Sequence, residues 1–378
     1  METLVWTENG MTRHARWHSE TGVPTPQRVE VVDDALKADV AYKLARKGVA
    51  LLWRGDYHNA RQLLRALGKR ADREANRRGR DERGSAAERF LAHRRQRARR
   101  AKILGSLIVV LDDGAHLRLR RAPDVASACH QAYGVLAEDM CVSLNELSGV
   151  LSAAQWQEKG VEIQALGARI HPGYGVFSPV RGEYVDLVDQ APIPTGARTA
   201  FDLGTGTGVL AVILARRGLA AVTATDINPR AVTCARDNVE RFGYTDRIRV
   251  EEADLFPSGG QADLIVCNPP WLPSTPTSDL EKGVYDPDSD MLKRYLAGLG
   301  SRLAPGGEGW LIISNLAEEL GLRGRDELPM RISEAGLRLL GHLDTTPRHP
   351  RAQDESDPLH VARSREVTTL WRLALDPD

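Results

Sequence analysis

The amino-acid sequence predicts an α/β protein, with a doubly wound, Rossmann-like parallel sheet in the C-terminal half and a mixed α/β domain before it. From residue 199 onward, short β-type runs alternate with amphipathic helical runs, which is the pattern of parallel strands joined by crossover helices. A glycine-rich turn connects the first of these strands to its helix. A chain of 378 residues is also long for one core. We therefore expect two domains, over 1–160 and 161–378.

The composition sets few limits on function. Hydrophobic residues make up 42% of the chain, and the 51 basic and 51 acidic residues cancel, so the net charge gives no general reason to expect a nucleic-acid partner. The N-terminus lacks the uninterrupted apolar core of a signal peptide, and no stretch approaches the roughly 18 apolar residues of a membrane span. We expect a cytoplasmic protein with no membrane partner.

The cysteines and histidines give no sign of a metal site. Each cysteine lies in an apolar or helical context, without the pairing that metal sites use: Cys129, Cys141, Cys234 and Cys267. Such thiols are typical of reduced, buried residues in cytoplasmic proteins. His58, His93 and His116 also lack metal-ligand spacing. We expect no bound metal.

The N-terminal half is predicted to contain helices around one β hairpin. Apolar residues recur at helical spacing in four segments, namely 33–48 (with Asp33 and Asp34 as caps), about 56–67, 125–138 and 140–157. The apolar run 103–111 leads through a turn at 112–114 into the alternating run 116–120, which predicts the hairpin.

A basic stretch interrupts these elements at 69–102. It holds 14 basic and 5 acidic residues, a net charge of +9. A solvated linker or a helix face of mixed charge explains such a stretch most simply. The alternative is contact with ribosomal or other RNA through phosphate neutralisation. Phe90 is its single aromatic residue, so stacking on unpaired bases is not indicated.

The C-terminal half follows the order expected of a doubly wound sheet. An extended segment over 161–181 and a helix over 182–189 lead into it. The β-type runs are 199–203, 221–226, 247–254, 262–270 and 307–314, and the helical runs are 208–218, 229–243 and about 289–303. The runs 337–344 and 366–375 are expected to add an antiparallel pair of strands.

The glycine-rich turn is the sharpest local signal. Residues 201–208 read FDLGTGTG, between a strand and an amphipathic helix. Glycine lets the backbone turn tightly and approach a ligand, and the amides at the start of the following helix point at it. The candidate contact residues are Gly204, Thr205, Gly206 and Gly208. Val209 stands where a dinucleotide-binding GxGxxG motif has its third glycine, which disfavours an NAD oxidoreductase.

Acidic residues mark the first three strands. Asp202 precedes the first glycine by two residues, Asp226 ends the next strand, and Asp254 closes the third. A carboxylate at Asp226, about 20 residues after the glycines, can accept hydrogen bonds from both hydroxyls of a ribose. Ile227, directly after it, is a further candidate contact. We therefore predict a nucleoside-containing ligand at the carboxyl ends of these strands.

The fourth strand ends in Asn268, Pro269, Pro270 and Trp271, at the edge where ligands of open α/β sheets bind. The Asn268 side-chain oxygen and the Pro269 carbonyl can accept hydrogen bonds from the two N–H groups of an –NH2 group. The two prolines add no competing donor. Two acceptors favour a pyramidal nitrogen with an available lone pair, and Trp271 can stack on the planar group. These four residues are the candidate catalytic residues, acting by orientation and electrostatics.

Taken together, these residues resemble the class I S-adenosylmethionine-dependent methyltransferases over about 160–375. The resemblance implies S-adenosylmethionine as the cofactor, with Asp202 facing its ammonium group, Asp226 on the ribose and Asp254 on the adenine amino group. Asn268 would lie against both cofactor and acceptor. The NPPW motif and the segments 175–188 and 280–296 are most similar to the HemK-type glutamine N-methyltransferases. Trp271 departs from that family, which usually has tyrosine there.

The resemblance implies an N-methyltransferase whose acceptor is a glutamine side chain in a translation factor or ribosomal protein. The alternative is an adenine N6 or guanine N2 amino group in RNA, anchored by the basic stretch, and a small-molecule amine is third. A cofactor-binding protein without catalytic activity would have no need of the NPPW motif. We identify no family for residues 1–160. We expect this domain to recognise the protein or RNA acceptor, which includes acceptors on the ribosome.

Overall fold

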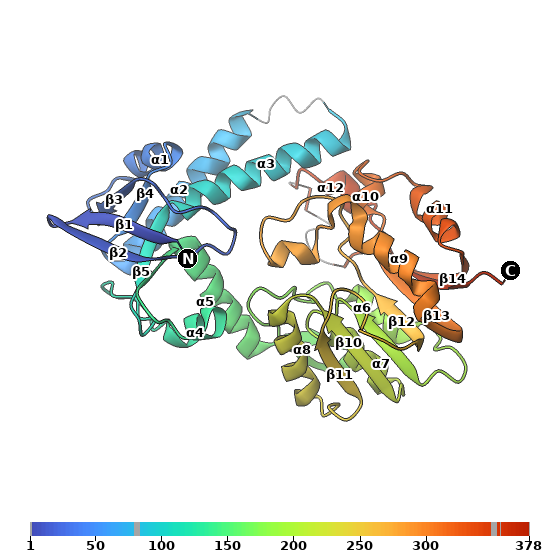
Figure 1. Ribbon diagram of the computed structural model, residues 1–378. Helices are drawn as coiled ribbons and strands as arrows, with labels where there is room; N and C mark the ends of the chain where they lie inside the picture. Colours follow the sequence, from blue (N-terminus) through green and yellow to red (C-terminus); the bar gives the residue numbers. More distant parts are fainter. Residues whose placement is uncertain (1, 79–83, 349–353, 356, 378) are drawn as a thin grey trace. The chain divides into compact units, whose positions relative to one another are not determined.

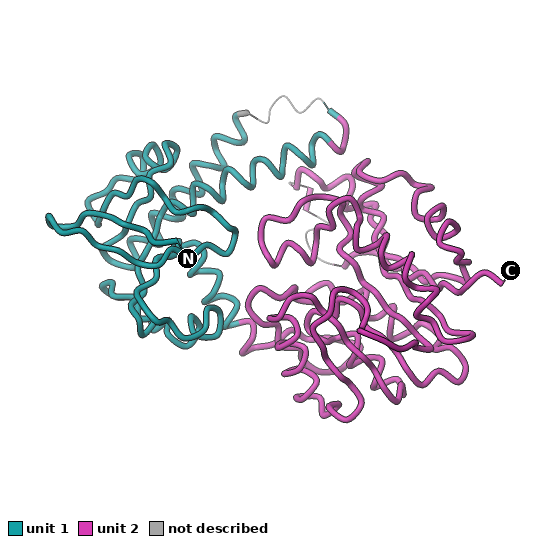
Figure 2. Tube along the Cα trace, viewed as in Figure 1, with its two compact units in different colours: residues 1–84, 88–155 teal, residues 85–87, 156–378 magenta. Residues whose placement is uncertain are grey.

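The computed structural model describes residues 2–78, 84–348, 354–355 and 357–377. The chain divides into two compact units, which Figure 2 distinguishes by colour. The N-terminal unit comprises 1–84 and 88–155, and the C-terminal unit comprises 156–378 together with 85–87. No helix among the described residues is long and apolar enough to cross a membrane.

The N-terminal unit is built on a mixed six-stranded sheet with the order β1-β2-β6-β5-β4-β3. Its strands are β1 (Thr3–Glu8), β2 (Met11–Trp17), β3 (Val29–Val32), β4 (Ala50–Trp53), β5 (Leu107–Leu111) and β6 (Met140–Ser143). Antiparallel pairing joins β1 to β2 and β5 to β6, and the remaining pairs are parallel. Leu4, Leu52 and Ile108 are fully buried in one of its hydrophobic clusters.

The structure corrects several predictions in this unit. The predicted helix over 140–157 is wrong at its start, because 140–143 form the buried central strand β6 and the helix α5 begins at Leu144. The run 116–120 is not a strand and makes only isolated bridges at Leu117 and Arg120. The strands β1 to β4 were not expected at all. The first two form a local hairpin across Asn9-Gly10, a turn signal that the prediction overlooked, whereas β3 and β4 depend on burial against distant segments.

The helices of this unit are α1 (Ala38–Arg46), α2 (Tyr57–Arg78), α3 (Ala86–Gly105), α4 (Ala126–Tyr133) and α5 (Leu144–Lys159). The helix predicted over 33–48 begins only at Ala38, and neither predicted cap serves it. Asp33 accepts a hydrogen bond from the Ala35 amide in a turn, whereas Asp34 accepts from the Asp56 amide. The predicted strand over 103–111 begins at Leu107, because α3 continues to Gly105.

The basic stretch 69–102 is helical in its described part, where α2 and α3 lie side by side as a long hairpin (Figure 1). An ion pair of 2.9 Å between Arg100 and Asp72 joins the two helices, and one of 2.8 Å between Arg70 and Asp39 joins α2 to α1. Part of the positive charge therefore holds the hairpin together, and other basic residues, such as Lys69, Arg73, Arg97 and Arg99, are exposed.

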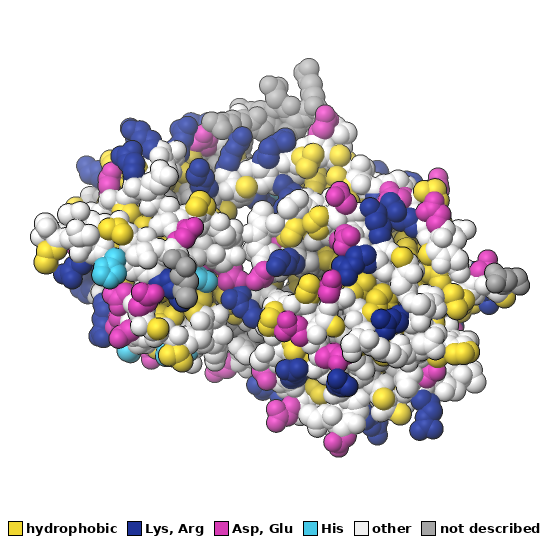
Figure 3. All heavy atoms as spheres, in the orientation of Figure 1, with side chains coloured by type: hydrophobic (Ala, Val, Ile, Leu, Met, Phe, Trp, Pro, Cys, Tyr) yellow, Lys and Arg dark blue, Asp and Glu magenta, His cyan; other side chains and the backbone are white. Residues whose placement is uncertain are grey.

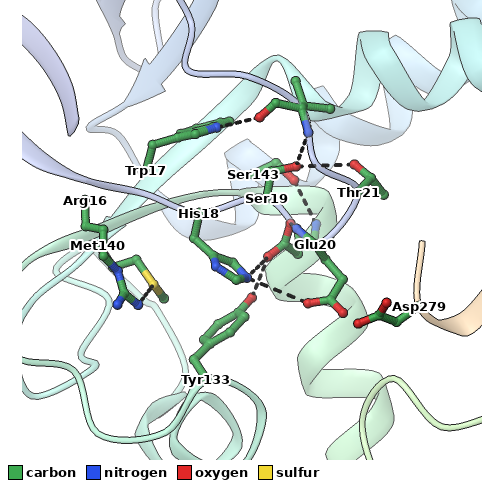
Figure 4. A network of polar contacts seen from close by, with 12 residues as sticks. Arg16, Trp17, His18, Ser19, Glu20, Thr21, Tyr133, Met140, Ser143 and Asp279 are labelled. Carbon is green, nitrogen blue, oxygen red and sulfur yellow. Dashed lines mark hydrogen bonds and ion pairs between the residues drawn. The ribbon is translucent and has the colours of Figure 1, made fainter. Parts of the chain in front are cut away.

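A polar network anchors the segment after β2 to the start of α5 (Figure 4). Glu146 accepts hydrogen bonds from the Tyr133 hydroxyl and the Glu20 amide, each at 3.0 Å, and its Oε1 lies 3.3 Å from His18 Nε2. The rings of His18 and Tyr133 meet edge to face at 4.7 Å. Burial raises the pKa of Glu146. These contacts hold the buried Glu146 carboxylate in place and tie the segment after β2 to α4 and α5 within this unit.

The C-terminal unit has the predicted doubly wound sheet, with the order β11-β10-β9-β12-β13-β15-β14. Its strands are β9 (Thr199–Leu203), β10 (Ala221–Asp226), β11 (Ile248–Glu252), β12 (Ala262–Cys267), β13 (Leu303–Ser314), β14 (Leu337–Thr345) and β15 (Thr368–Leu375). The first five are mutually parallel, and β15 is antiparallel to both β13 and β14. This confirms the Rossmann-like fold, and the last two strands form the antiparallel pair that the sequence predicts.

Helices cover both faces of this sheet (Figure 1). One hydrophobic cluster includes residues of α6 (Glu183–Gln190), α7 (Val209–Arg216) and α8 (Pro229–Arg241), and a second includes residues of α9 (Asp290–Arg302) and α11 (Glu327–Glu334). Along β9, Ala200 belongs to the first cluster and Phe201 to the second. Since side chains alternate along a strand, the backbone of β9 is fixed from both sides and holds its carboxyl end in place.

Short elements complete this unit. They are β7 (Val161–Ile163), η2 (Gln164–Leu166), β8 (Ala168–Ile170), η3 (Leu280–Gly283), η4 (Pro287–Ser289), α10 (Leu316–Glu319) and α12 (His360–Arg363). The β7 and β8 strands form a two-stranded antiparallel sheet before α6. The segment predicted to be extended over 161–181 therefore contains a small hairpin.

Candidate active site

The glycine-rich turn lies between β9 and α7 and has an unusual backbone. Gly204, Gly206 and Gly208 have φ angles of +70°, +55° and +81°, which favour glycine. A side chain at Gly204 would lie 2.9 Å from the Met291 methyl group, and one at Gly208 would lie 3.2 Å from the Ala235 backbone. The alternation of these glycines with threonines curls the backbone into a cradle of the kind that binds anions and polar ligands.

The buried Asp202 side chain stabilises this turn through hydrogen bonds. Its side chain is 1% exposed, and its Oδ2 atom accepts hydrogen bonds from Thr205 Oγ1 at 2.6 Å and from the Ala211 amide at 3.0 Å. Burial raises the pKa of Asp202 to about 6, although both bonds act in the opposite direction. Among the described residues no hydrogen bond reaches its Oδ1 atom. A cationic ligand beside that oxygen would relieve the cost of the buried charge.

Asp226 reaches the same turn from the end of β10. Its Oδ2 atom accepts from the Gly206 amide at 2.9 Å, and its Oδ1 atom accepts from the Asn228 amide at 2.9 Å. Burial raises the pKa of Asp226. The structure thus brings two of the predicted acids together on one loop. Ile227 follows Asp226 with 63% of its side chain exposed, an apolar surface beside the carboxylates.

Asp254 stands two residues beyond the end of β11 and is more open. Its side chain is 59% exposed and forms an ion pair with Arg294 on α9, with an N–O distance of 2.8 Å. Arg294 also lies 3.5 Å from Asp290. Sequence reasoning did not identify this arginine. A ligand group bound by Asp254 would have to share it with Arg294, so its assignment to adenine stays a prediction.

Asn268 and Trp271 contact each other at the end of β12. The Trp271 indole N–H donates to Asn268 Oδ1 at 2.9 Å, and the Arg181 guanidinium carbon lies 5.3 Å from the centre of the Trp271 ring. Trp271 also packs against both hydrophobic clusters of the unit. The indole therefore already has partners on its face and at its N–H, whereas the sequence predicts it as a platform for the acceptor. Pro269 is buried and Pro270 is half-buried.

The loop before α9 carries backbone strain beside the glycine turn. Asp288 and Ser289 both have φ angles near +55°, in the left-handed region that non-glycine residues avoid. The loop is held by Asp286, which is 5% exposed and accepts hydrogen bonds from the Met291 and Leu292 amides at 3.0 and 3.2 Å. Burial raises the pKa of Asp286. This loop places Met291 against Gly204.

The described residues contain no cluster of three or more His, Cys, Asp or Glu side chains that could hold a metal ion. Burial raises the pKa of Cys267, at the end of β12, well above its usual range, so this thiol is a core residue and not a nucleophile. The carboxyl edge of the sheet thus has a backbone cradle for a polar ligand, the buried Asp202 carboxylate for a cationic group of that ligand, and the Asn268 amide nearby.

Comparison with known proteins adds a family to this geometry. The methyltransferase small domain family matches residues 175–319. A tRNA1(Val) (adenine(37)-N6)-methyltransferase of Shewanella loihica is 33% identical over 178 residues, which cover 44% of this chain and 70% of that protein. A release factor glutamine methyltransferase of Bacteroides thetaiotaomicron is 34% identical over 158 residues, 37% of this chain and 55% of that protein.

A third relative is a ribosomal protein L11 methyltransferase of Pelotomaculum thermopropionicum, which is 35% identical over 168 residues. Those residues cover 43% of this chain and 47% of that protein. Each of these three relatives matches less than half of the present chain, and the family match begins at residue 175, within the C-terminal unit.

Proposed function

This chain belongs to the methyltransferase small domain family of class I S-adenosylmethionine-dependent methyltransferases, and on that premise we propose that it methylates a planar amide or amino nitrogen. The acceptor we favour is a glutamine side chain in a translation factor or ribosomal protein. The observation that carries the proposal is the position of Asn268, at the carboxyl end of β12 beside the strand that bears the glycine cradle.

The residues at the sheet edge fit the cofactor. The positive-φ glycines leave room for the backbone to approach a ligand, and Asp202 is a buried carboxylate whose raised pKa a cation would lower. We assign Gly204, Thr205, Gly206 and Gly208 to the cradle. Asp202 is assigned to the ammonium group, and Asp226 with Ile227 to the ribose and its surroundings.

S-adenosylmethionine supplies an electrophilic sulfonium methyl group when bound. The acceptor nitrogen would take this methyl group through its lone pair, sulfur would keep the electron pair of the bond it gives up, and the surplus proton on nitrogen would leave for solvent. In this assignment Asn268 Oδ1 and the Pro269 carbonyl accept hydrogen bonds from the N–H groups of the acceptor, which directs its lone pair at the methyl group. These acceptors are most valuable as positive charge develops on nitrogen, that is, in the transition state.

A glutamine acceptor is supported by the release factor glutamine methyltransferase among the relatives. A second candidate acceptor, an exocyclic amino group of adenine or guanine in RNA, is supported by the surface of the α2–α3 hairpin. Four basic residues at intervals of four along α2 are all exposed: Arg65, Lys69, Arg73 and Arg77. Within the described part of the chain none of them pairs with a carboxylate. Dark blue side chains gather over this hairpin on the face drawn in Figure 3.

One experiment separates these acceptors. The enzyme and methyl-labelled S-adenosylmethionine are incubated separately with release factors, intact ribosomes and naked ribosomal RNA, and the labelled residue is located by mass spectrometry. We expect the label on a glutamine amide nitrogen. Label on an exocyclic base nitrogen would establish the RNA alternative. Label on oxygen or carbon would contradict the proposed use of Asn268.

A further inference from the structure

A chain of polar contacts runs along the carboxyl edge of the sheet, from the start of β15 to the NPPW motif. Glu366 lies two residues before the start of β15 and is 2% exposed. Its Oε1 atom accepts from Ser314 Oγ on β13 at 2.8 Å and from Arg181 Nη2 at 3.0 Å. Arg181 Nε also donates to Glu183 Oε1 at 3.4 Å, and Glu183 is 4% exposed.

Two buried carboxylates thus fix the guanidinium of Arg181. Its own side chain is 21% exposed, so the ion pair with Glu366 lies largely out of solvent and is screened less than a surface pair. Fixed in this way, the planar guanidinium faces the Trp271 ring at 5.3 Å, within the range of a cation–π interaction. A lysine ammonium lacks the several N–H donors in fixed directions that bind two carboxylates, and it lacks a planar group that could stack on the indole.

The Trp271 indole in turn fixes Asn268. A half-turn about the Cβ–Cγ bond exchanges the oxygen and nitrogen positions of the asparagine amide. A hydrogen-bond donor directed at Oδ1 selects one of these two orientations. The Trp271 N–H supplies that donor at 2.9 Å. A carbonyl oxygen has two lone pairs, so Oδ1 keeps one for the acceptor nitrogen. A phenyl ring at this position would pack similarly but would leave the Asn268 amide free to rotate.

We propose that Arg181 is the positioning residue of the acceptor site, and that it acts through the Trp271 indole to hold the Asn268 amide in the orientation needed for methyl transfer. This inference rests on the proposed function. It assigns Trp271 a different role from a stacking platform, because the guanidinium occupies one face of the ring and the N–H is directed at Asn268. Glu183, Glu366 and Ser314 anchor the arginine.

The test needs a variant without the guanidinium and one without the indole N–H. Arg181→Met removes the charge and keeps most of the bulk, and Trp271→Phe keeps a ring but removes the donor. We expect each to lower kcat about tenfold or more, with KM and cofactor affinity within about twofold. Because both act through Asn268, the double variant should be no slower than the slower single variant. Arg181→Lys should behave like Arg181→Met, and it serves if the methionine variant does not fold.

A second readout does not depend on turnover. In protein labelled with ¹⁵N in its tryptophans, the Trp271 indole signal is identified by its loss in Trp271→Phe, and its N–H exchange with solvent is measured. We expect Arg181→Met to accelerate that exchange at least about tenfold, because the indole loses its support. Unchanged exchange, or unchanged kcat, in Arg181→Met would overturn the proposal.

The same unit contains a matched control. Arg372 is also 21% exposed, donates two hydrogen bonds to Glu308, and Glu308 accepts from the Trp310 indole at 3.0 Å. Arg372→Met should alter the Trp310 signal, leave the Trp271 signal unchanged and keep kcat within about twofold. Loss of kcat in this variant would mean that any buried arginine–glutamate pair matters, which overturns a specific role for Arg181. Normal transfer by Asn268→Ala would instead refute the proposed function itself.

Discussion

Asp202 places a carboxylate where an ionised group is costly. Burial raises its pKa from 3.8 to about 6, which corresponds to about 3 kcal/mol of lost stability when the group is ionised. The folded state binds this proton more tightly than the unfolded state does. The loss is therefore absent below a pH of about 4, grows as the pH rises to about 6, and is complete above that. A ligand cation beside the carboxylate would recover part of it.

We predict that cofactor binding releases a proton near pH 6. An ammonium group beside Asp202 favours the carboxylate and lowers its pKa, so cofactor affinity should fall as the pH drops from about 6 toward 4. Calorimetric titrations in two buffers of different ionisation enthalpy measure the proton directly. Asp202→Asn should abolish the release. If this variant still releases the same proton, the titrating group is another one, with Asp226 as the next candidate.

Asn268 provides the second test at this scale. Asn268→Ala should leave cofactor affinity within about twofold and lower turnover at least about a hundredfold, because the amide oxygen is assigned to the transition state and not to the cofactor. Isothermal titration and single-turnover methyl transfer measure the two quantities. Asn268→Asp keeps an oxygen acceptor for the Trp271 N–H and should retain measurable activity. Equal loss in both variants would indicate that the amide donor, and not the oxygen, is the group in use.

The α2–α3 hairpin is the element whose charge bears on the acceptor. Along α2, exposed basic residues recur every four positions, about 6 Å apart along the axis, and form a slowly winding stripe. Arg70 and Arg100 are instead paired with Asp39 and Asp72. The stripe, of which Lys69, Arg73 and Arg77 belong to the basic stretch, is thus an exposed basic surface that is available to a polyanion.

We predict that replacing the stripe residues Arg65, Lys69, Arg73 and Arg77 with glutamine weakens binding to naked ribosomal RNA and flattens its salt dependence. Each phosphate contact that is lost should reduce the slope of log affinity against log salt by nearly one. A binding series between about 50 and 200 mM salt measures the slope. Replacing the paired Arg70 and Arg100 is the control and should change stability more than the slope. An unaltered slope in the stripe variant would assign this surface to solvent.

At the scale of the whole molecule, the two compact units differ in their relation to the cofactor. All residues that we assign to S-adenosylmethionine lie in the C-terminal unit. A ligand that binds only the folded state stabilises it, by about 2.7 kcal/mol at a hundred times its Kd. Scanning calorimetry of the full chain should therefore show the cofactor raising the transition of the C-terminal unit. If both units respond equally, they unfold as one cooperative body, and the proposed division into a recognition domain and a catalytic domain has no thermodynamic counterpart.

Local patterns in the sequence are enough to predict the C-terminal fold, which the structure confirms, and to predict where its site lies. Strand and helix periodicity, a glycine-rich turn and acids at strand ends are local properties of the sequence, and they are enough to predict Asp202, Asp226 and Asn268 as site residues. Parallel strands carry their carboxyl ends to the same edge, so these three residues had to lie near one another once the strand order was right. The family match covers the same part of the chain.

The support of that site depends on contacts between segments that are distant in the sequence. Arg181 and Glu366 are separated by 185 residues along the chain, and no spacing rule links them, because their contact exists only after β15 joins the sheet. The same holds for β6, a buried strand in a segment whose pattern predicts a helix, and for the basic stretch, whose charges separate into paired and exposed sets only when α2 packs against α3. Short-range patterns record which face of an element is buried. Which distant segment covers that face is decided by packing, and the orientation of Trp271 and Asn268 depends on that packing.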